Sequence, residues 1–89
     1  MKHEIYSIKD TLTSYQGVFT MMNEASAVRA FSMLANDKNT TVGQNPGDHQ
    51  LWHIGTWDDQ TGKIEAIEPE YVTNAASCIK VNFEVMGDE

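Results

Sequence analysis

A small α+β domain, in which one helix packs on an antiparallel sheet of four to five strands, is the fold class that this sequence predicts. Apolar residues recur at helical spacing after Asn23, which indicates one amphipathic helix. Residues 51–67 contain two strand-like runs joined by a turn, and residues 79–86 alternate between apolar and polar side chains. Because 89 residues leave room for one folded unit, we expect residues 1–89 to form a single domain with a frayed end at 86–89.

The first expected strand is the short aromatic and β-branched run over residues 5–9, which Asp10 follows. Residues 11–17 are polar and typical of a turn. Residues 17–21 fit either a second strand or an extended approach to the helix, and the sequence leaves both readings open.

The helix is the best-defined element. Asn23 is a favourable N-cap, and Glu24 in the first turn complements the helix dipole. The helix should end near residues 36–37, because asparagine, glycine and proline are frequent in the next ten residues. For residues 38–48 we expect a long loop, either functional or a disordered connector. The predicted apolar face consists of Ala27, Val28, Phe31, Leu34 and Ala35.

A hairpin should follow this loop. Its strands cover residues 51–57 and 63–67, and the turn at 58–62 places Gly62 where a positive φ is needed. Pro69 should end the second strand. A short helical turn is expected within residues 71–78, before the last strand at 79–86.

The net charge of −7 is unevenly distributed along the chain. Residues 1–38 carry four basic and four acidic side chains, whereas residues 39–89 carry two lysines and nine acids. This balance argues against strong nonspecific binding of nucleic acid, which normally requires a basic face. The acids either keep the protein soluble or form a face for a basic partner. The residues of that candidate acidic face are Asp58, Asp59, Glu65, Glu68 and Glu70.

No catalytic, metal or cofactor signature appears in the sequence, so we expect a protein that is not an enzyme and needs no cofactor. His49 and His53 would lie about 13 Å apart on a strand, too far to share a metal ion. Cys78 has no basic neighbour in sequence and is expected to be a buried structural thiol. One cysteine forms no internal disulfide, so dimerisation is the remaining common aid for so small a core.

Three aromatic residues deserve comparison with nucleic-acid-binding sheets. Tyr6, Trp52 and Trp57 lie on expected strands, where exposed rings stack on unpaired bases in other proteins. The alternative is that the rings belong to the core. The sequence also lacks an apolar run long enough for a membrane span or a signal peptide, and we therefore expect an intracellular protein without a membrane partner.

Several of these segments, taken in order, resemble the small nonstructural protein of gokushovirus-type microviruses, which are phages with single-stranded DNA genomes. The resemblance covers roughly residues 3–67, and the last third of the chain matches no pattern of that family. It implies a non-enzymatic protein of the host bacterial cytoplasm that supports viral DNA replication or packaging. The segments that carry the resemblance are residues 6–10, 23–31, 36–37, 46–48, 51–58 and 61–62.

Two functional hypotheses follow from the residues and the resemblance together. In the first, the protein is a homodimeric binding module that contacts single-stranded DNA or the viral replication complex. In the second, it is an acidic protein–protein adaptor, or a DNA-mimic inhibitor of a host factor. Arg29 either contacts phosphate or a partner, or pairs with Glu24 or another acid of the same fold. The contact residues of the first hypothesis are Lys2, Tyr6, Lys9, Arg29 and Lys38.

Overall fold

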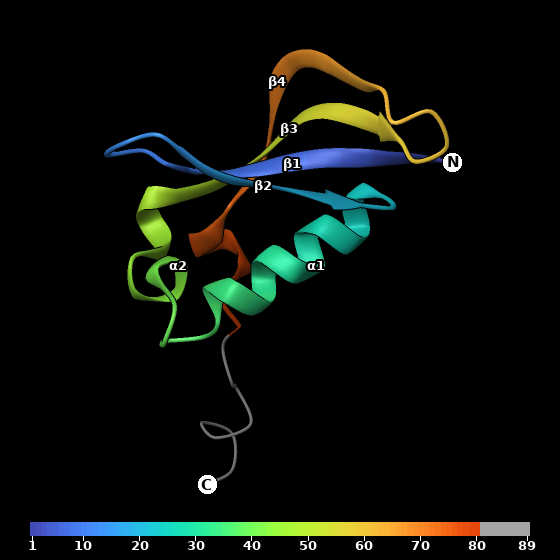
Figure 1. The fold of residues 1–89 in the computed structure, drawn as a ribbon. Coiled ribbons are helices and arrows are strands. Elements are labelled where there is room, and N and C mark those ends of the chain that lie inside the picture. The colour runs from blue at the N-terminus through green and yellow to red at the C-terminus, as the bar shows by residue number, and fades with distance from the viewer. Residues whose placement is uncertain (81–89) are drawn as a thin grey trace, which may run out of the picture.

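Four antiparallel strands form one sheet, and one main helix packs against it (Figure 1). This is the expected α+β fold, seen in a computed structural model that describes residues 1–80. Most of the strand expected at 79–86 lies outside the described residues. The strand order is β2-β1-β3-β4, so β2 and β4 form the edges of the sheet. The strands are β1 (Lys2–Asp10), β2 (Tyr15–Met21), β3 (His49–Asp58) and β4 (Ile64–Asn74).

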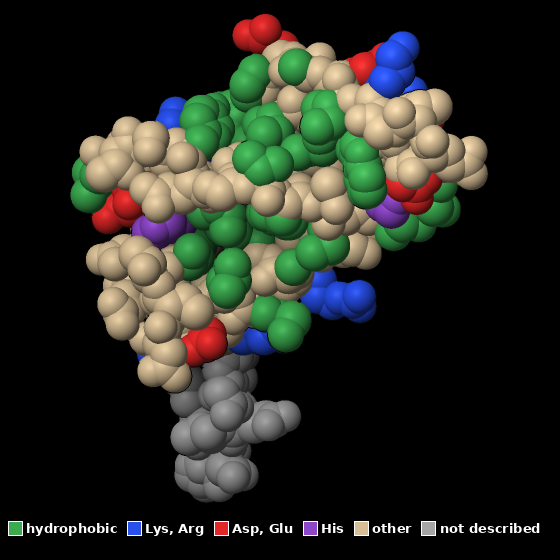
Figure 2. Space-filling model, in the orientation of Figure 1, with side chains coloured by type: hydrophobic (Ala, Val, Ile, Leu, Met, Phe, Trp, Pro, Cys, Tyr) green, Lys and Arg blue, Asp and Glu red, His purple; other side chains and the backbone are tan. Residues whose placement is uncertain are grey.

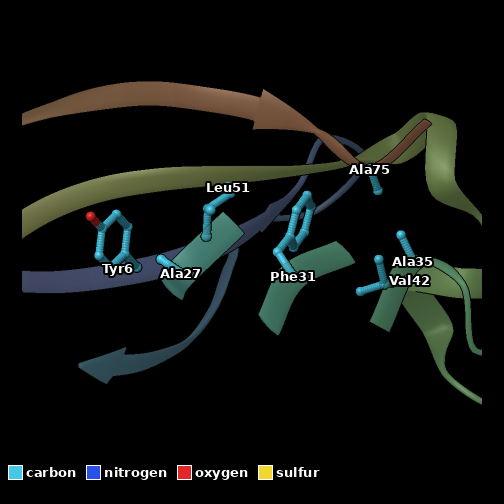
Figure 3. Packing of buried hydrophobic residues seen from close by; sticks show 7 residues of the cluster. All are labelled: Tyr6, Ala27, Phe31, Ala35, Val42, Leu51 and Ala75. Carbon is cyan, nitrogen blue, oxygen red and sulfur yellow. The ribbon is translucent and has the colours of Figure 1, made fainter. Parts of the chain in front are cut away.

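The helix α1 (Glu24–Ala35) begins where the sequence predicts. The side chain of Asn23 caps it, since its Oδ1 accepts a hydrogen bond of 2.8 Å from the backbone N–H of Ser26. The apolar face of α1 packs on β1 and β3, and Phe31 lies fully buried between the helix and the strands (Figure 3). The buried cluster consists of Tyr6, Ala27, Phe31, Ala35, Val42, Leu51 and Ala75.

Residues 38–48 are folded, so the expectation of a long loop is wrong. They form the short helix α2 (Thr41–Gln44) and a 3-10 turn, η1 (Pro46–Asp48). The hydroxyl of Thr40 accepts a hydrogen bond from the N–H of Gly43 and donates one to a carbonyl at the end of α1. Any side chain at Gly43 would collide with backbone, because a Cβ there would lie 2.0 Å from the carbonyl oxygen of Asp37. This close packing holds α2 against α1.

The second strand of the hairpin is longer than predicted. Gly62 has the expected positive φ of 79°, but β4 continues through Pro69 to Asn74. Proline is compatible with β4 because this strand is an edge and one side of its backbone has no neighbour. The register of the β3–β4 ladder shifts where Pro69 lies, between the pairs Gly55–Ala66 and His53–Glu70, and it shifts again after the pair Trp52–Tyr71. The helical turn expected within residues 71–78 is present as η2 (Ala75–Cys78).

The two faces of the sheet have different surroundings. The helices and 3-10 turns all lie on one side of it, as Figure 1 shows. The other side, which we call the open face, has no covering element among residues 1–80. Hydrophobic side chains gather there above the strands in Figure 2. In the described part of the chain, no helix has the length and apolar character needed to cross a membrane.

Candidate nucleic-acid interface on the open face

A row of three aromatic rings crosses the open face of the sheet. Tyr15 on β2, Trp52 on β3 and Tyr71 on β4 lie side by side, although they are far apart in the sequence. The centroid of the Trp52 ring is 6.0 Å from that of Tyr15 and 5.8 Å from that of Tyr71. Both pairs meet edge to face, at 82° and 75°. This geometry is favourable for aromatic pairs and leaves ring surface for further stacking.

Lys9 on β1 supplies a positive charge within this row. Its Nζ lies 5.3 Å from the ring centroid of Tyr15 and 5.3 Å from that of Trp52, within the range of cation–π contacts. Lys9 and Tyr15 are direct partners in the β1–β2 ladder, so the backbone fixes their proximity. The ion pairs formed among residues 1–80 use other basic groups, which leaves this ammonium available to an anion.

The rings are held in place and are still accessible. Tyr15 is 43% exposed and Tyr71 is 53% exposed. Trp52 lies between them, half-buried, and its Nε1 donates a hydrogen bond of 2.9 Å to Oε1 of Gln50. We call Lys9, Tyr15, Trp52 and Tyr71 the aromatic platform.

An uncharged hollow of about 400 Å³ adjoins the platform. Tyr15 belongs to both, and the Ser7 hydroxyl in the hollow donates a hydrogen bond of 2.6 Å to the carbonyl of Gly17. The floor and walls are otherwise mostly apolar and come from β2, β3 and β4. The lining residues are Ser7, Tyr15, Gly17, Val18, Ile54, Ala66, Ile67 and Pro69.

This arrangement suits a ligand that combines flat rings with negative charge. Exposed aromatic rings on a sheet stack on unpaired bases, and a lysine among them attracts phosphate. Base pairs inside a duplex do not offer their faces to such rings. The platform therefore has the chemistry of a single-stranded nucleic-acid contact.

Tyr6 is not part of this surface, and its predicted role as a stacking ring is wrong. Its side chain points toward α1 and is only 1% exposed. Its ring contacts those of Phe19 and His53 instead. Burial raises the pKa of the Tyr6 hydroxyl, and the nearby carboxylates of Glu24 and Glu4 raise it further. Tyr6 is thus a core residue.

Of the four predicted cationic contacts, the structure places only Lys9 beside the exposed rings. Lys2 lies at the other end of β1, where its Nζ is 3.7 Å from a carboxylate oxygen of Glu65. Arg29 is exposed on α1, on the opposite side of the sheet, and lines a groove with Lys80. Lys38 is exposed after the end of α1. These cations do not form one basic patch.

The five predicted acidic contacts lie at the end of β3, in the turn that follows it and along β4, and four of them have a basic group nearby. The N-terminal ammonium is 3.8 Å from Asp58 and 3.0 Å from Asp59, and His3 is 2.8 Å from Asp59. The pKa of Asp58 is lowered chiefly by the backbone N–H of Gln60, and that of Asp59 chiefly by its hydrogen bond with His3. Glu65 and Glu70 lie near Lys2 and His53. Glu68 is exposed on β4.

The remaining candidates of the sequence are separated in space. Trp57 contacts His3 at 5.2 Å between ring centroids, at the acidic end of the sheet, away from Lys9. His49 is buried and bonds through Nδ1 to the carbonyl of Asn45, whereas Nε2 of His53 lies 2.7 Å from Glu4. Residues 1–80 contain no group of three potential metal ligands. Cys78 is partly buried.

Tyr15 and Tyr71 are the platform residues that sequence reasoning missed. Tyr15 lies in the stretch assigned to a turn, and Tyr71 lies in the stretch assigned to a helical turn. A signal for Tyr71 was present, because residues 71–73 are aromatic and β-branched and favour a strand.

Comparison with known proteins gives one result. The chain matches the family model described as phage ORF5 protein over residues 3–78. No curated protein and no solved structure was found to match it. The match spans most of the chain and includes β1 except Lys2, the other three strands, α1 and the whole platform. The chain therefore belongs to the phage ORF5 protein family.

Proposed function

We propose that this phage protein binds single-stranded DNA through the aromatic platform. It does so as a non-enzymatic protein that supports replication or packaging of a single-stranded DNA genome in the cytoplasm of the infected bacterium. The observation that carries the proposal is the position of Lys9, 5.3 Å from the centroids of both Tyr15 and Trp52 on the open face. Membership of a phage family supports the viral setting. The proposal of a microvirus rests on the resemblance of the sequence segments to gokushovirus-type proteins.

The geometry favours a single strand over a duplex. Each exposed ring offers a surface for one base, and base–aromatic stacking contributes about 1–3 kcal/mol per base. The 400 Å³ hollow beside Tyr15 offers uncharged space next to the rings. A duplex would meet a single lysine here, and duplex binding depends mainly on several phosphate contacts.

The net charge of −7 is compatible with this proposal because, among residues 1–80, no acidic side chain belongs to the platform or lines the hollow beside it. Glu65 and Glu70, the two carboxylates on β4 that form ion pairs, approach Lys2 and His53 instead of the platform rings. The hollow beside the platform has no charged lining residue. Binding should consequently depend more on stacking than on charge, with a shallow salt dependence.

The test is a titration of fluorescently labelled single-stranded and duplex DNA at low and moderate salt. We expect measurable affinity for the single strand and much weaker affinity for the duplex. Replacing Trp52 by alanine should weaken single-strand binding by about 5- to 150-fold, which corresponds to one stacked base.

Trp57→Ala is the matched control. It removes the same side chain from the same strand, but at the end where Asp58 and Asp59 lie. The proposal predicts near-normal binding by this variant. Equal losses in both tryptophan variants, or no binding of single-stranded DNA by the native protein at low salt, would contradict it.

A further inference from the structure

The two edges of the sheet differ in how well they are protected against pairing with another strand. The β4 edge carries Pro69, two bulges, and the charges of Glu65, Glu68 and Glu70. Proline, charge and bulges are the features by which natural edge strands avoid pairing with a further strand. The β4 edge is therefore closed to sheet extension.

The β2 edge lacks most of this protection. Residues 11–22, which include the whole strand, contain no charged side chain and no proline. A glycine with φ of 74° at position 17 lies at a bulge in the β1–β2 ladder, after which residues 19–21 pair regularly with β1. This uncharged stretch is notable in a chain of net charge −7. It is a place where two copies can approach with little electrostatic repulsion.

An apolar groove of about 420 Å³ runs beside the same edge, between β2 and α1. Phe19 and Met21 form one wall, and Met33 and Leu34 form the other. Exposed apolar side chains occur in the groove and along the edge strand, since Met33 in the groove is 70% exposed, Val18 on β2 is 68% exposed, and Met22 after β2 is 49% exposed. The lining residues are Ile8, Phe19, Met21, Ala30, Phe31, Met33 and Leu34, none of which is charged.

We propose that a second copy of this chain binds at the β2 edge. The regular stretch at residues 19–21 of each copy pairs antiparallel with that of the other about a two-fold axis, and the two sheets join into one of eight strands. Apolar side chains of the partner, such as Met22 and Met33, fill the groove beside the edge. Charge favours a second copy over a basic or acidic partner, because neither the edge nor the groove offers an opposite charge. This inference stands independently of DNA binding.

The experiment measures the mass of the full chain in solution by sedimentation equilibrium, from low to high micromolar concentration. We expect a monomer–dimer equilibrium. Val18→Glu should weaken dimerisation by at least about tenfold, because each copy would place a new charge at the shared edge. Met33→Glu, on α1, should act in the same direction.

Ile64→Glu is the matched control, since it makes the same change on the opposite edge strand at nearly equal exposure, 70% against 68%. It should alter dimerisation by less than about twofold. Circular dichroism should show native secondary structure in all variants, because the replaced side chains are exposed. A strict monomer at all concentrations overturns the proposal, and so does a dimer that Ile64→Glu disrupts and Val18→Glu does not.

Discussion

The covered and open faces of the sheet use aromatic residues for opposite purposes. Tyr6 and Trp52 lie on neighbouring strands, since Trp52 pairs with Ser7, the residue next to Tyr6. Tyr6 faces α1 and is 1% exposed, whereas Trp52 faces solvent between Tyr15 and Tyr71. One step along a strand turns a side chain to the other face. The position of the helix therefore decides which rings stabilise the fold and which remain available for binding.

The largest expected effect is on the covered face. Phe31→Ala removes a fully buried ring from the core and should lower the free energy of unfolding by about 3–5 kcal/mol. Urea denaturation followed by circular dichroism measures this change. Tyr71→Ala, on the open face, should cost far less stability because Tyr71 is 53% exposed. Similar losses in the two variants would contradict the division between the faces.

The next prediction concerns Tyr71 on the open face and distinguishes the contribution of its ring to DNA binding from that of its hydroxyl. Tyr71→Ala should weaken single-stranded DNA binding by about 1–3 kcal/mol, which is the contribution of one stacked base. Tyr71→Phe keeps the ring and should bind nearly as well as the native protein. Fluorescence anisotropy gives both affinities. If the phenylalanine variant also lost binding, the hydroxyl and not stacking would make the contact.

The elements of the covered face were largely predictable, because their signals are local. Asn23 and the apolar spacing up to Ala35 define α1 without reference to the rest of the chain. Pro69 misled the prediction, since proline ends an inner strand but is tolerated on an edge, and strand order is not a local property. The requirement for glycine at position 43 was equally unpredictable from the sequence. It arises because the backbone of Asp37 occupies the space where a side chain would lie.

The aromatic platform was only partly predictable for the same reason. Trp52 and Lys9 were singled out from the sequence, but their partners Tyr15 and Tyr71 come from strands at opposite edges of the sheet. Alternation within a strand indicates which residues share a face. It does not indicate which face the helix covers, and that choice excluded Tyr6.

A smaller effect is expected on the salt dependence of DNA binding when Lys9, the charged residue of the platform, is replaced. In the proposed complex Lys9→Gln removes one phosphate contact, so the slope of log affinity against log salt for single-stranded DNA should become shallower by about 0.7. Titrations at several salt concentrations give this slope. Arg29→Gln removes the same charge from α1 on the covered side, and its slope should equal that of the native protein. An unchanged slope in Lys9→Gln would place the phosphate elsewhere.

The smallest expected effect is on the pH dependence of stability, and it involves Tyr6 on the covered face. Burial raises the pKa of Tyr6, so its neutral form contributes stability that is fully present below the ordinary tyrosine pKa of about 10. This contribution is lost as the pH rises through the higher value of the folded state. Between about pH 9 and pH 11, the free energy of unfolding measured by urea denaturation should fall more steeply with pH for the native protein than for Tyr6→Phe. Parallel curves would mean that Tyr6 ionises as freely when folded as when unfolded.

The long β1–β3 ladder also determines when the fold can form. Its partners are between 39 residues (10 to 49) and 56 residues (2 to 58) apart in the chain. On the ribosome, β1, β2 and α1 are complete long before β3 is synthesised. Leu51 on β3, which completes the core under α1, therefore arrives late. Contacts between residues so far apart in the chain slow folding. The apolar surface of the nascent N-terminal half should therefore stay exposed until residue 58 has emerged from the ribosome.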